Sequence, residues 1–217
     1  MQDTYRHKGL RRNLVSELHK KGIKDKQVLE AMERVPRHLF LDNVFVEIAY
    51  ENRAFPIGAS QTISHPYTVA FQTELLQIKK GDKILEIGTG SGYQSAVLCE
   101  MKAKVYSIER QKSLFVKAKR LLPKMGYKLW QVHGDGYDGL PSFAPFNKIL
   151  VTCGAPFIPQ ELLKQLIIGG LMVIPVGEGE EQEMIMIKKI SDTEYDRTEL
   201  GVFKFVPMLS DKERKLK

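Results

Sequence analysis

Apolar residues in the first quarter of the chain recur at helical spacing. In residues 13–23 and 25–35 they fall about three or four positions apart, and this period predicts two helices. Pro36 is expected to end the second helix, because proline lacks the N–H group that continues a helix. Residues 1–54 are therefore predicted to form an N-terminal helical extension.

A loop rich in Gly, Ser, Thr and Pro separates this extension from the rest of the chain. Residues 55–66 belong to this loop and also include Phe55, Ile57 and Ile63, so we expect it to be anchored in the core. Loops of this kind often carry function. A third helix is predicted over residues 67–78.

From Lys83 onward, short apolar segments alternate with helical patterns, which is typical of βαβ units in a parallel sheet. The segments are almost continuously apolar, so helices should cover both faces of the sheet. No helical pattern separates the last two segments, and the sheet should therefore end antiparallel. The predicted strands are 83–88, 104–109, 128–136, 148–156, 171–177, 183–190 and 203–208; the helices are 95–101, 113–126 and 158–167, with a turn at Gly169 and Gly170.

The composition fits one folded α/β domain over residues 1–217, with residues 67–217 as its core. The chain has 217 residues, of which 43% are hydrophobic and 27% charged, close to the averages of globular proteins. It shows no signal-peptide pattern and no stretch of about 18 uncharged apolar residues, so we expect a cytoplasmic protein without a membrane partner. Two cysteines are too few for a disulfide scaffold or a four-thiolate metal site.

The net charge of +7 makes nucleic acid a partner to consider. Five of the basic residues fall in residues 112–124, where a solvated helix face is the simpler interpretation. No motif that reads RNA or DNA accompanies them, so we expect no nucleic-acid partner. The histidines lack metal-ligand spacing, which predicts no metal site. No heptad or broad apolar surface is visible, so a monomer is expected.

The clearest chemical signal is a glycine-rich turn in residues 85–94, between a predicted strand and a predicted helix. Glycines let the backbone approach a ligand closely, and the helix N-terminus offers free N–H groups. Tyr93 stands where a dinucleotide fingerprint has Gly or Ala, which counts against a diphosphate. Glu86 adds a carboxylate that suits a cationic group. The candidate ligand-binding residues are Glu86, Gly88, Thr89, Gly90, Ser91 and Gly92.

Two further acidic residues stand at the ends of the next two predicted strands. Glu109 is placed to accept hydrogen bonds from both hydroxyls of a ribose. Asp135, followed by Gly136, is placed to receive an adenine amino group, although an Asp between glycines is more often only a turn. The three strand ends together predict an adenosine site, of the kind that NAD and S-adenosylmethionine both occupy.

These motifs resemble the class I S-adenosylmethionine-dependent methyltransferases and, more narrowly, the protein-L-isoaspartate (D-aspartate) O-methyltransferase family. The resemblance covers most of the chain, and the block around Ser64 makes it specific, since methyltransferases in general do not share that block. Phe55, His65 and the Cys153-Gly154 pair depart modestly from the family pattern. The matching blocks besides the glycine-rich turn are 35–37, 56–58, 61–64, Pro66, 134–136, 155–156, 169–170, 175–177 and 205–207.

The resemblance implies a Rossmann-like fold and an enzyme of protein repair. The implied reaction transfers a methyl group from S-adenosyl-L-methionine to the free α-carboxyl of L-isoaspartyl residues in damaged proteins and peptides, leaving S-adenosyl-L-homocysteine. By position, Ser64 matches the active-site serine, Glu109 the ribose-binding acid and Asp135 the adenine-contacting acid. The implied peptide-binding residues are Pro56, Ile57, Gly58, Thr62, Ile63, Val206 and Pro207.

Two interpretations of Ser64 follow from its place just before the helix predicted over residues 67–78. A substrate carboxylate is already ionised at neutral pH and needs no general base, so Ser64 is expected to orient it beside free helix N–H groups. Serine is also a favoured N-cap, and a purely capping Ser64 would leave turnover unchanged.

Two other functions remain open from the residues alone. One is a methyltransferase of the same fold that acts on RNA or a small molecule, although neither a basic groove nor base-holding aromatic residues are visible. The other is a nicotinamide-dependent oxidoreductase or a non-catalytic nucleotide-binding module. Tyr93 and the antiparallel end of the sheet both count against the second function.

Overall fold

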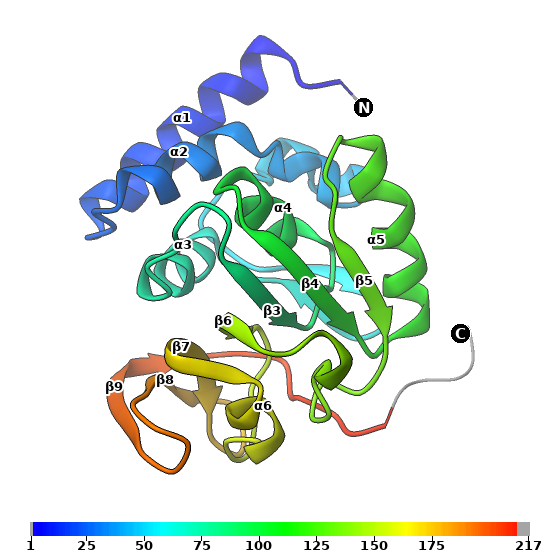
Figure 1. Ribbon diagram of the computed structural model, residues 1–217. Helices are drawn as coiled ribbons and strands as arrows, with labels where there is room; N and C mark the ends of the chain where they lie inside the picture. The colour runs from blue at the N-terminus through cyan, green and yellow to red at the C-terminus, as the bar shows by residue number, and fades with distance from the viewer. Residues whose placement is uncertain (1, 212–217) are drawn as a thin grey trace.

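A seven-stranded sheet forms the centre of the protein, seen in Figure 1 in a computed structural model that describes residues 2–211. The strand order is β5-β4-β3-β6-β7-β8-β9. Neighbouring strands from β5 to β7 pair parallel, while β8 pairs antiparallel with both β7 and β9. The mostly parallel sheet with an antiparallel end is thus confirmed. Its strands are β3 (Lys83–Ile87), β4 (Lys104–Glu109), β5 (Trp130–His133), β6 (Phe146–Val151), β7 (Leu166–Val176), β8 (Gln182–Lys189) and β9 (Tyr195–Phe203).

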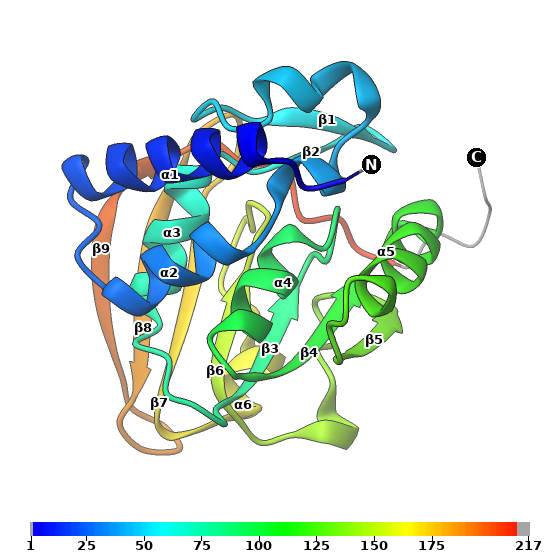
Figure 2. The same cartoon turned by 90° about the horizontal axis from the view of Figure 1, so that it is seen from above.

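Two apolar cores cover the two faces of this sheet, as the alternation of side chains along its strands requires. One core lies under the helices α1 to α5, whose first four members gather on one side in Figure 2. The other is smaller and lies under α6 and the segment around Leu140. No helix in the described residues could span a membrane. The helices are α1 (Tyr5–Lys20), α2 (Lys26–Arg34), α3 (Pro66–Leu75), α4 (Tyr93–Glu100), α5 (Lys112–Lys124) and α6 (Gln160–Lys164), with short 3-10 turns η1 (Arg37–Phe40), η2 (Asn43–Ile48) and η3 (Pro141–Phe143).

The two helices predicted for the N-terminal extension are present. Helix α2 starts where the Asp25 carboxylate accepts hydrogen bonds from the N–H groups of Gln27 and Val28, and it ends at Arg34, two residues before Pro36. Polar caps at the start and proline after the end are the usual signals for such bounds.

The segment predicted as a loop over residues 55–66 contains an antiparallel hairpin of β1 (Phe55–Gly58) and β2 (Gln61–Ile63). Phe55, Ile57 and Ile63 are buried, as expected of a segment anchored in the core. The strands escaped prediction because they are very short and their turn, at Ala59 and Ser60, has positive φ angles without the glycine that usually marks such a turn.

The predicted turn at Gly169 and Gly170 is wrong, since both glycines lie inside β7. The helix predicted over residues 158–167 is shorter, because Leu166 already pairs with Phe146 of the sheet. Gly169 has a φ of +79°, and the register between β6 and β7 shifts nearby. The glycines therefore allow an irregularity within a strand and do not separate a helix from a strand.

The seventh strand lies earlier than predicted, at Tyr195–Phe203 instead of residues 203–208. It is a mostly exposed edge strand with a polar sequence, so it lacks the apolar signal of the inner strands. The apolar residues after it cross the end of the sheet, where the Gly154 N–H donates to the Val206 carbonyl and the Met208 N–H donates to the Gly154 carbonyl. This crossing segment contributes to the site described next.

Candidate functional site

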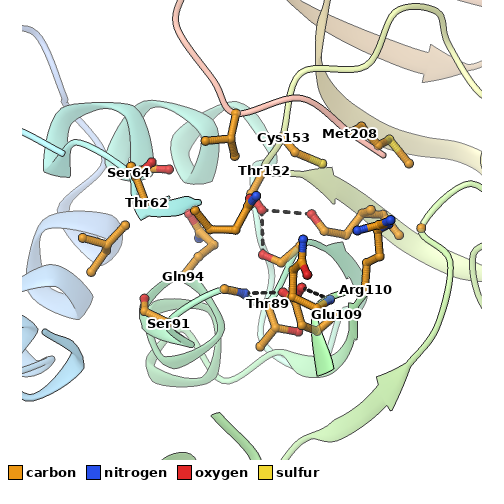
Figure 3. A pocket seen from close by; sticks show the side chains of 18 of the residues that line it. Thr62, Ser64, Thr89, Ser91, Gln94, Glu109, Arg110, Thr152, Cys153 and Met208 are labelled. Carbon is orange, nitrogen blue, oxygen red and sulfur yellow. Dashed lines mark hydrogen bonds between the residues drawn. The ribbon is translucent and has the colours of Figure 1, made fainter. Parts of the chain in front are cut away.

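A cavity of about 830 Å³, part of it open to solvent, lies at the carboxyl ends of β3, β4 and β6. Ligands of α/β proteins typically bind at this edge of the sheet. Figure 3 shows Ser64 and Thr62 on one side of the cavity, Glu109 and Arg110 on the other, and Thr152 between them. Residues 206–209, from the crossing segment, complete its wall.

The glycine-rich turn forms the floor of the cavity on the side of β3 and β4. Gly88, Gly90 and Gly92 have φ angles of +95°, +53° and +88°, which glycine adopts without strain. A Cβ atom on Gly88 would lie 2.7 Å from Thr152 Oγ1, and one on Gly92 would lie 3.0 Å from a methyl group of Leu122. Gly88 and Gly90 line the cavity together with Thr89 and Ser91, whereas Gly92 lies behind it at the start of α4.

Glu109 holds this turn in place from the end of β4. Its Oε2 atom accepts a hydrogen bond of 2.7 Å from the Gly90 N–H, and its Oε1 atom accepts one of 2.7 Å from the Gln111 N–H. Burial raises the pKa of this carboxyl, while the backbone N–H groups oppose the shift. The carboxylate lines the cavity, so its oxygens can also accept hydrogen bonds from hydroxyls of a ligand there.

Glu86 does not line the cavity, contrary to the expectation that it faces a cationic group there. Its side chain is fully buried between β3 and α4, where Oε2 accepts hydrogen bonds from the hydroxyls of Ser95 and Ser107 and Oε1 has no partner. Burial raises the pKa of Glu86 to about 7. The hydrogen bonds from the two serine hydroxyls lower this pKa, and the charge of Glu109 raises it further. Glu86 reaches the cavity only indirectly, since Ser107 Oγ lies 2.5 Å from Thr89 Oγ1.

Asp135 is not part of the cavity wall either, although its neighbour Gly136 is. The Asp135 carboxylate accepts hydrogen bonds from the N–H groups of Tyr137, at 2.9 Å, and Asp211, at 2.5 Å. The first of these is the usual bond of an Asp turn. A Cβ atom on Gly136 would collide with Ile87, so glycine is required at the wall. The adenine contact of Asp135 stays a prediction.

Ser64 lines the cavity and has a hydroxyl without a hydrogen-bond partner among residues 2–211. The alternative that it only caps the following helix is wrong. Helix α3 begins at Pro66, and the residue at its N-cap position is His65. The Tyr67 N–H in the first turn is capped by Asn52, to whose Oδ1 it donates a hydrogen bond of 2.9 Å. The Ser64 hydroxyl is therefore available to a ligand.

The predicted peptide-binding residues divide into two groups. Thr62, Ile63, Val206 and Pro207 line the cavity beside Ser64. The three residues of β1 do not: Ile57 is buried behind the glycine-rich turn, 3.5 Å from the position of a Cβ atom on Gly90, while Pro56 and Gly58 are exposed on the hairpin.

Sequence reasoning missed Thr152 and Met208, which also line the cavity. Thr152 directly follows β6, so its position at a strand end is the same signal that identifies Glu109. Its Oγ1 atom donates a hydrogen bond of 2.7 Å to the Gly88 carbonyl. Met208 reaches the cavity because the segment after β9 crosses the end of the sheet. The local sequence pattern does not predict this crossing. Cys153 lies beside them with its pKa raised to about 12 by burial, so its thiol stays protonated at neutral pH.

Asp3, His7 and His38 bring potential metal-ligand atoms together at the N-terminus of α1. A metal ion lies in the plane of each imidazole that binds it, yet the two rings are stacked with centroids 3.9 Å apart and planes 21° apart. Their lone pairs therefore do not converge on one point, and Arg11 donates to both oxygens of Asp3. This arrangement does not favour a metal ion, and the absence of a metal site stays a prediction.

Comparison with known proteins points to one family. The sequence profile of the family described as protein-L-isoaspartate(D-aspartate) O-methyltransferase matches residues 9–213. A relative from Flavobacterium psychrophilum, named protein-L-isoaspartate O-methyltransferase, is 58% identical over 98% of this chain and 100% of its own length. One from Christiangramia forsetii with the same name is 57% identical over the same shares.

Solved structures agree with these matches. One titled protein-L-isoaspartate O-methyltransferase is 30% identical with a TM-score of 0.83, over 91% of this chain and 65% of that chain. Another, from Plasmodium falciparum and in complex with S-adenosyl-L-homocysteine, has a TM-score of 0.80 over 92% of this chain and 98% of that one. At 24% identity, the second likeness supports the fold alone.

Proposed function

The chain belongs to the protein-L-isoaspartate(D-aspartate) O-methyltransferase family, and from this premise we propose that it methylates the free α-carboxyl of L-isoaspartyl residues in damaged proteins and peptides. The methyl donor is S-adenosyl-L-methionine, and the product peptide carries a methyl ester. One observation carries the proposal: a single cavity joins the glycine-rich turn and Glu109 on one side to the unpartnered Ser64 hydroxyl on the other.

The side of the cavity next to β4 fits the donor. Glu109 offers its carboxylate oxygens to ribose hydroxyls, and glycines at positions 88 and 90 let the backbone come close to the ligand. When bound, S-adenosyl-L-methionine supplies a methyl group on a positively charged sulfur. The fully buried Glu86 contributes through Ser107 and Thr89, and it does not contact the donor directly.

The opposite side fits an ionised carboxyl group. The substrate oxygen forms the new bond to the methyl carbon as the bond from sulfur breaks, and no proton moves, so no residue needs to act as a base. The task of the protein is then to position the carboxylate and to exclude water. Ser64 supplies a hydrogen-bond donor, and Ile63, Val206 and Pro207 supply apolar walls beside it.

The proposed activity is tested by labelled methyl transfer to two peptides that differ only in L-isoaspartate or normal L-aspartate at one position. We expect selective labelling of the isoaspartyl peptide that is lost in mild base, as a methyl ester requires. Labelling of neither peptide, with S-adenosyl-L-homocysteine still bound, would reject isoaspartate as the substrate. RNA and small molecules would then be the acceptors to try.

Ser64→Ala is expected to lower kcat/KM for the isoaspartyl peptide by about 10- to 100-fold. A hydrogen bond to a charged group contributes about 1.5 to 3 kcal/mol, which corresponds to this loss. Thermal stability and S-adenosyl-L-homocysteine affinity should not change, because Ser64 is not the cap of α3. Ser60→Ala, in the exposed turn of the same hairpin, is the matched control. Equal kinetics of the two variants would reject the orienting role.

We further propose a monomeric, cytoplasmic enzyme without a nucleic-acid partner, in one domain made of the extension, the hairpin segment and the α/β core. Two free cysteines in the described chain fit a reducing compartment. Large apolar side chains that are exposed in residues 2–211, such as Val44, Trp130 and Val202, belong to separate elements of the fold. Light scattering tests the monomer, and binding to labelled RNA tests the partner.

A further inference from the structure

Arg37 is a fully buried cation next to the proposed active site, and the mechanism above makes no use of it. It opens η1, directly after Pro36, and within residues 2–211 no carboxylate pairs with it. Burial lowers its pKa to about 10, with Tyr93 opposing the shift, so the guanidinium is still charged at neutral pH. A buried charge without an acidic partner is costly and calls for a reason.

The guanidinium donates its hydrogen bonds to backbone carbonyls on both sides of the hairpin. Nε donates to the Ala49 carbonyl at 3.1 Å, and Nη2 donates to the Arg53 carbonyl at 3.3 Å, both before β1. Nη2 also donates to the Ser64 carbonyl at 2.8 Å, directly after β2. One side chain thus ties the two ends of the hairpin together and makes its shortest bond to Ser64.

The same guanidinium also packs against Tyr93, which lines the other side of the cavity. Its Cζ atom lies 4.8 Å from the ring centroid of Tyr93, a cavity residue that opens α4 directly after the glycine-rich turn. Arg37 therefore contacts one residue from the proposed substrate side and one from the proposed donor side. Its charge also acts on the neighbour of Ser64, since burial and the charge of Arg37 together lower the pKa of His65.

The Ser64 backbone depends on this contact for its position. Helix α3 begins at Pro66, so Ser64 lies outside the helix. The Ser64 carbonyl accepts a hydrogen bond from Arg37 Nη2, and not one from the Thr68 N–H in the first helical turn. Because the Ser64 hydroxyl has no partner of its own in the described chain, only the backbone directs it toward the cavity.

We propose that Arg37 is a positioning residue for methyl transfer, which fixes Ser64 through its carbonyl and attracts the substrate carboxylate with its unneutralised charge. This inference rests on the proposed function. The charge acts mainly on binding, because the carboxylate loses its own charge as the ester forms and a nearby cation favours the bound substrate over the transition state. The hydrogen bond to Ser64 acts on the geometry of the reaction and therefore on kcat.

The test combines two replacements of Arg37 with Ser64→Ala, each assayed with the isoaspartyl peptide and checked for S-adenosyl-L-homocysteine binding. Arg37→Met removes both charge and hydrogen bonds, and we expect kcat/KM to fall by about 10- to 100-fold. Arg37→Lys keeps the charge but lacks the planar fork, so KM should stay near the wild-type value while kcat falls. In kcat, either double variant with Ser64→Ala should be little worse than Ser64→Ala alone, since both changes remove the same positioning of the carboxylate. The lost charge of Arg37→Met should appear separately, as a higher KM.

Arg11→Met is the matched control. Arg11 is also buried, and it binds the Asp3 carboxylate and the Tyr50 hydroxyl without touching the cavity. It should lower stability and leave the peptide KM and kcat unchanged. If Arg37→Met does not fold, as the loss of its thermal unfolding transition would show, Arg37→Lys carries the same cycle.

Two results overturn the inference: effects of Arg37 and Ser64 on kcat that multiply independently, or an Arg37→Lys enzyme with wild-type kcat. Both results are interpreted only if the wild-type enzyme methylates the isoaspartyl peptide. A wild-type enzyme that does not methylate it would reject the proposed function instead.

Discussion

Glu109→Ala is expected to raise the dissociation constant of S-adenosyl-L-homocysteine by about 100- to 1000-fold. Two hydrogen bonds from ribose hydroxyls to a carboxylate contribute about 3 to 4 kcal/mol together, which corresponds to this range. The change also removes the acceptor of the Gly90 N–H, so the glycine-rich turn loses the bond that holds it against the end of β4. Isothermal titration calorimetry measures the effect directly.

Glu109→Gln separates the two contributions. A glutamine amide has one oxygen, so it can satisfy the N–H of Gly90 or that of Gln111 but not both, and it places an NH₂ group against the other. We expect an affinity between those of the wild type and the alanine variant. Glu199→Ala, on the exposed edge strand β9, is the control and should bind normally. Unchanged affinity in Glu109→Ala would show that the adenosine part of the ligand does not bind at this strand end.

Glu109 could be found from the sequence because its place depends on local order alone. A strand followed by a helix and another parallel strand puts successive strand ends at one edge of the sheet, whatever the rest of the chain does. The same logic locates the glycine-rich turn and Gly136, and it holds equally for Thr152, which follows β6. Ser64 came from the family resemblance, since its place beside Glu109 depends on how the hairpin packs.

Side-chain direction and long-range contacts were beyond the same reasoning. Side chains alternate between the two faces of β3, and Glu86 lies on the face that packs against α4. The sequence shows where the strand ends, but it does not show which face its last side chains occupy. Strand β9 was missed because an exposed edge strand needs no apolar residues. Asn52 caps α3, and Arg37 binds the Ser64 carbonyl; both hydrogen bonds join segments that are distant in sequence. A local pattern of apolar and polar residues therefore cannot predict them.

Glu86→Gln is expected to change the pH dependence of stability. The pKa of Glu86 is raised from 4.5 to about 7 in the folded protein, chiefly by burial. Between these values the folded protein keeps a proton that the unfolded chain has lost, so this group lowers the unfolding free energy as pH rises through that window and has no further effect above it. A glutamine does not titrate, so relative to the wild type the variant should gain about 3 kcal/mol between about pH 4 and pH 8.

Urea unfolding of both proteins across this pH range provides the test, because all other titrating groups are common to the two curves. The variant can be less stable at low pH, where its NH₂ group replaces the unpartnered Oε1, and the prediction concerns only how the difference changes with pH. Parallel curves would mean that Glu86 is ionised in the folded protein. The hydroxyls of Ser95 and Ser107 would then be solvating a buried charge. The bond that Thr89 at the cavity wall donates to Ser107 would be anchored by that charge and not by a neutral acid.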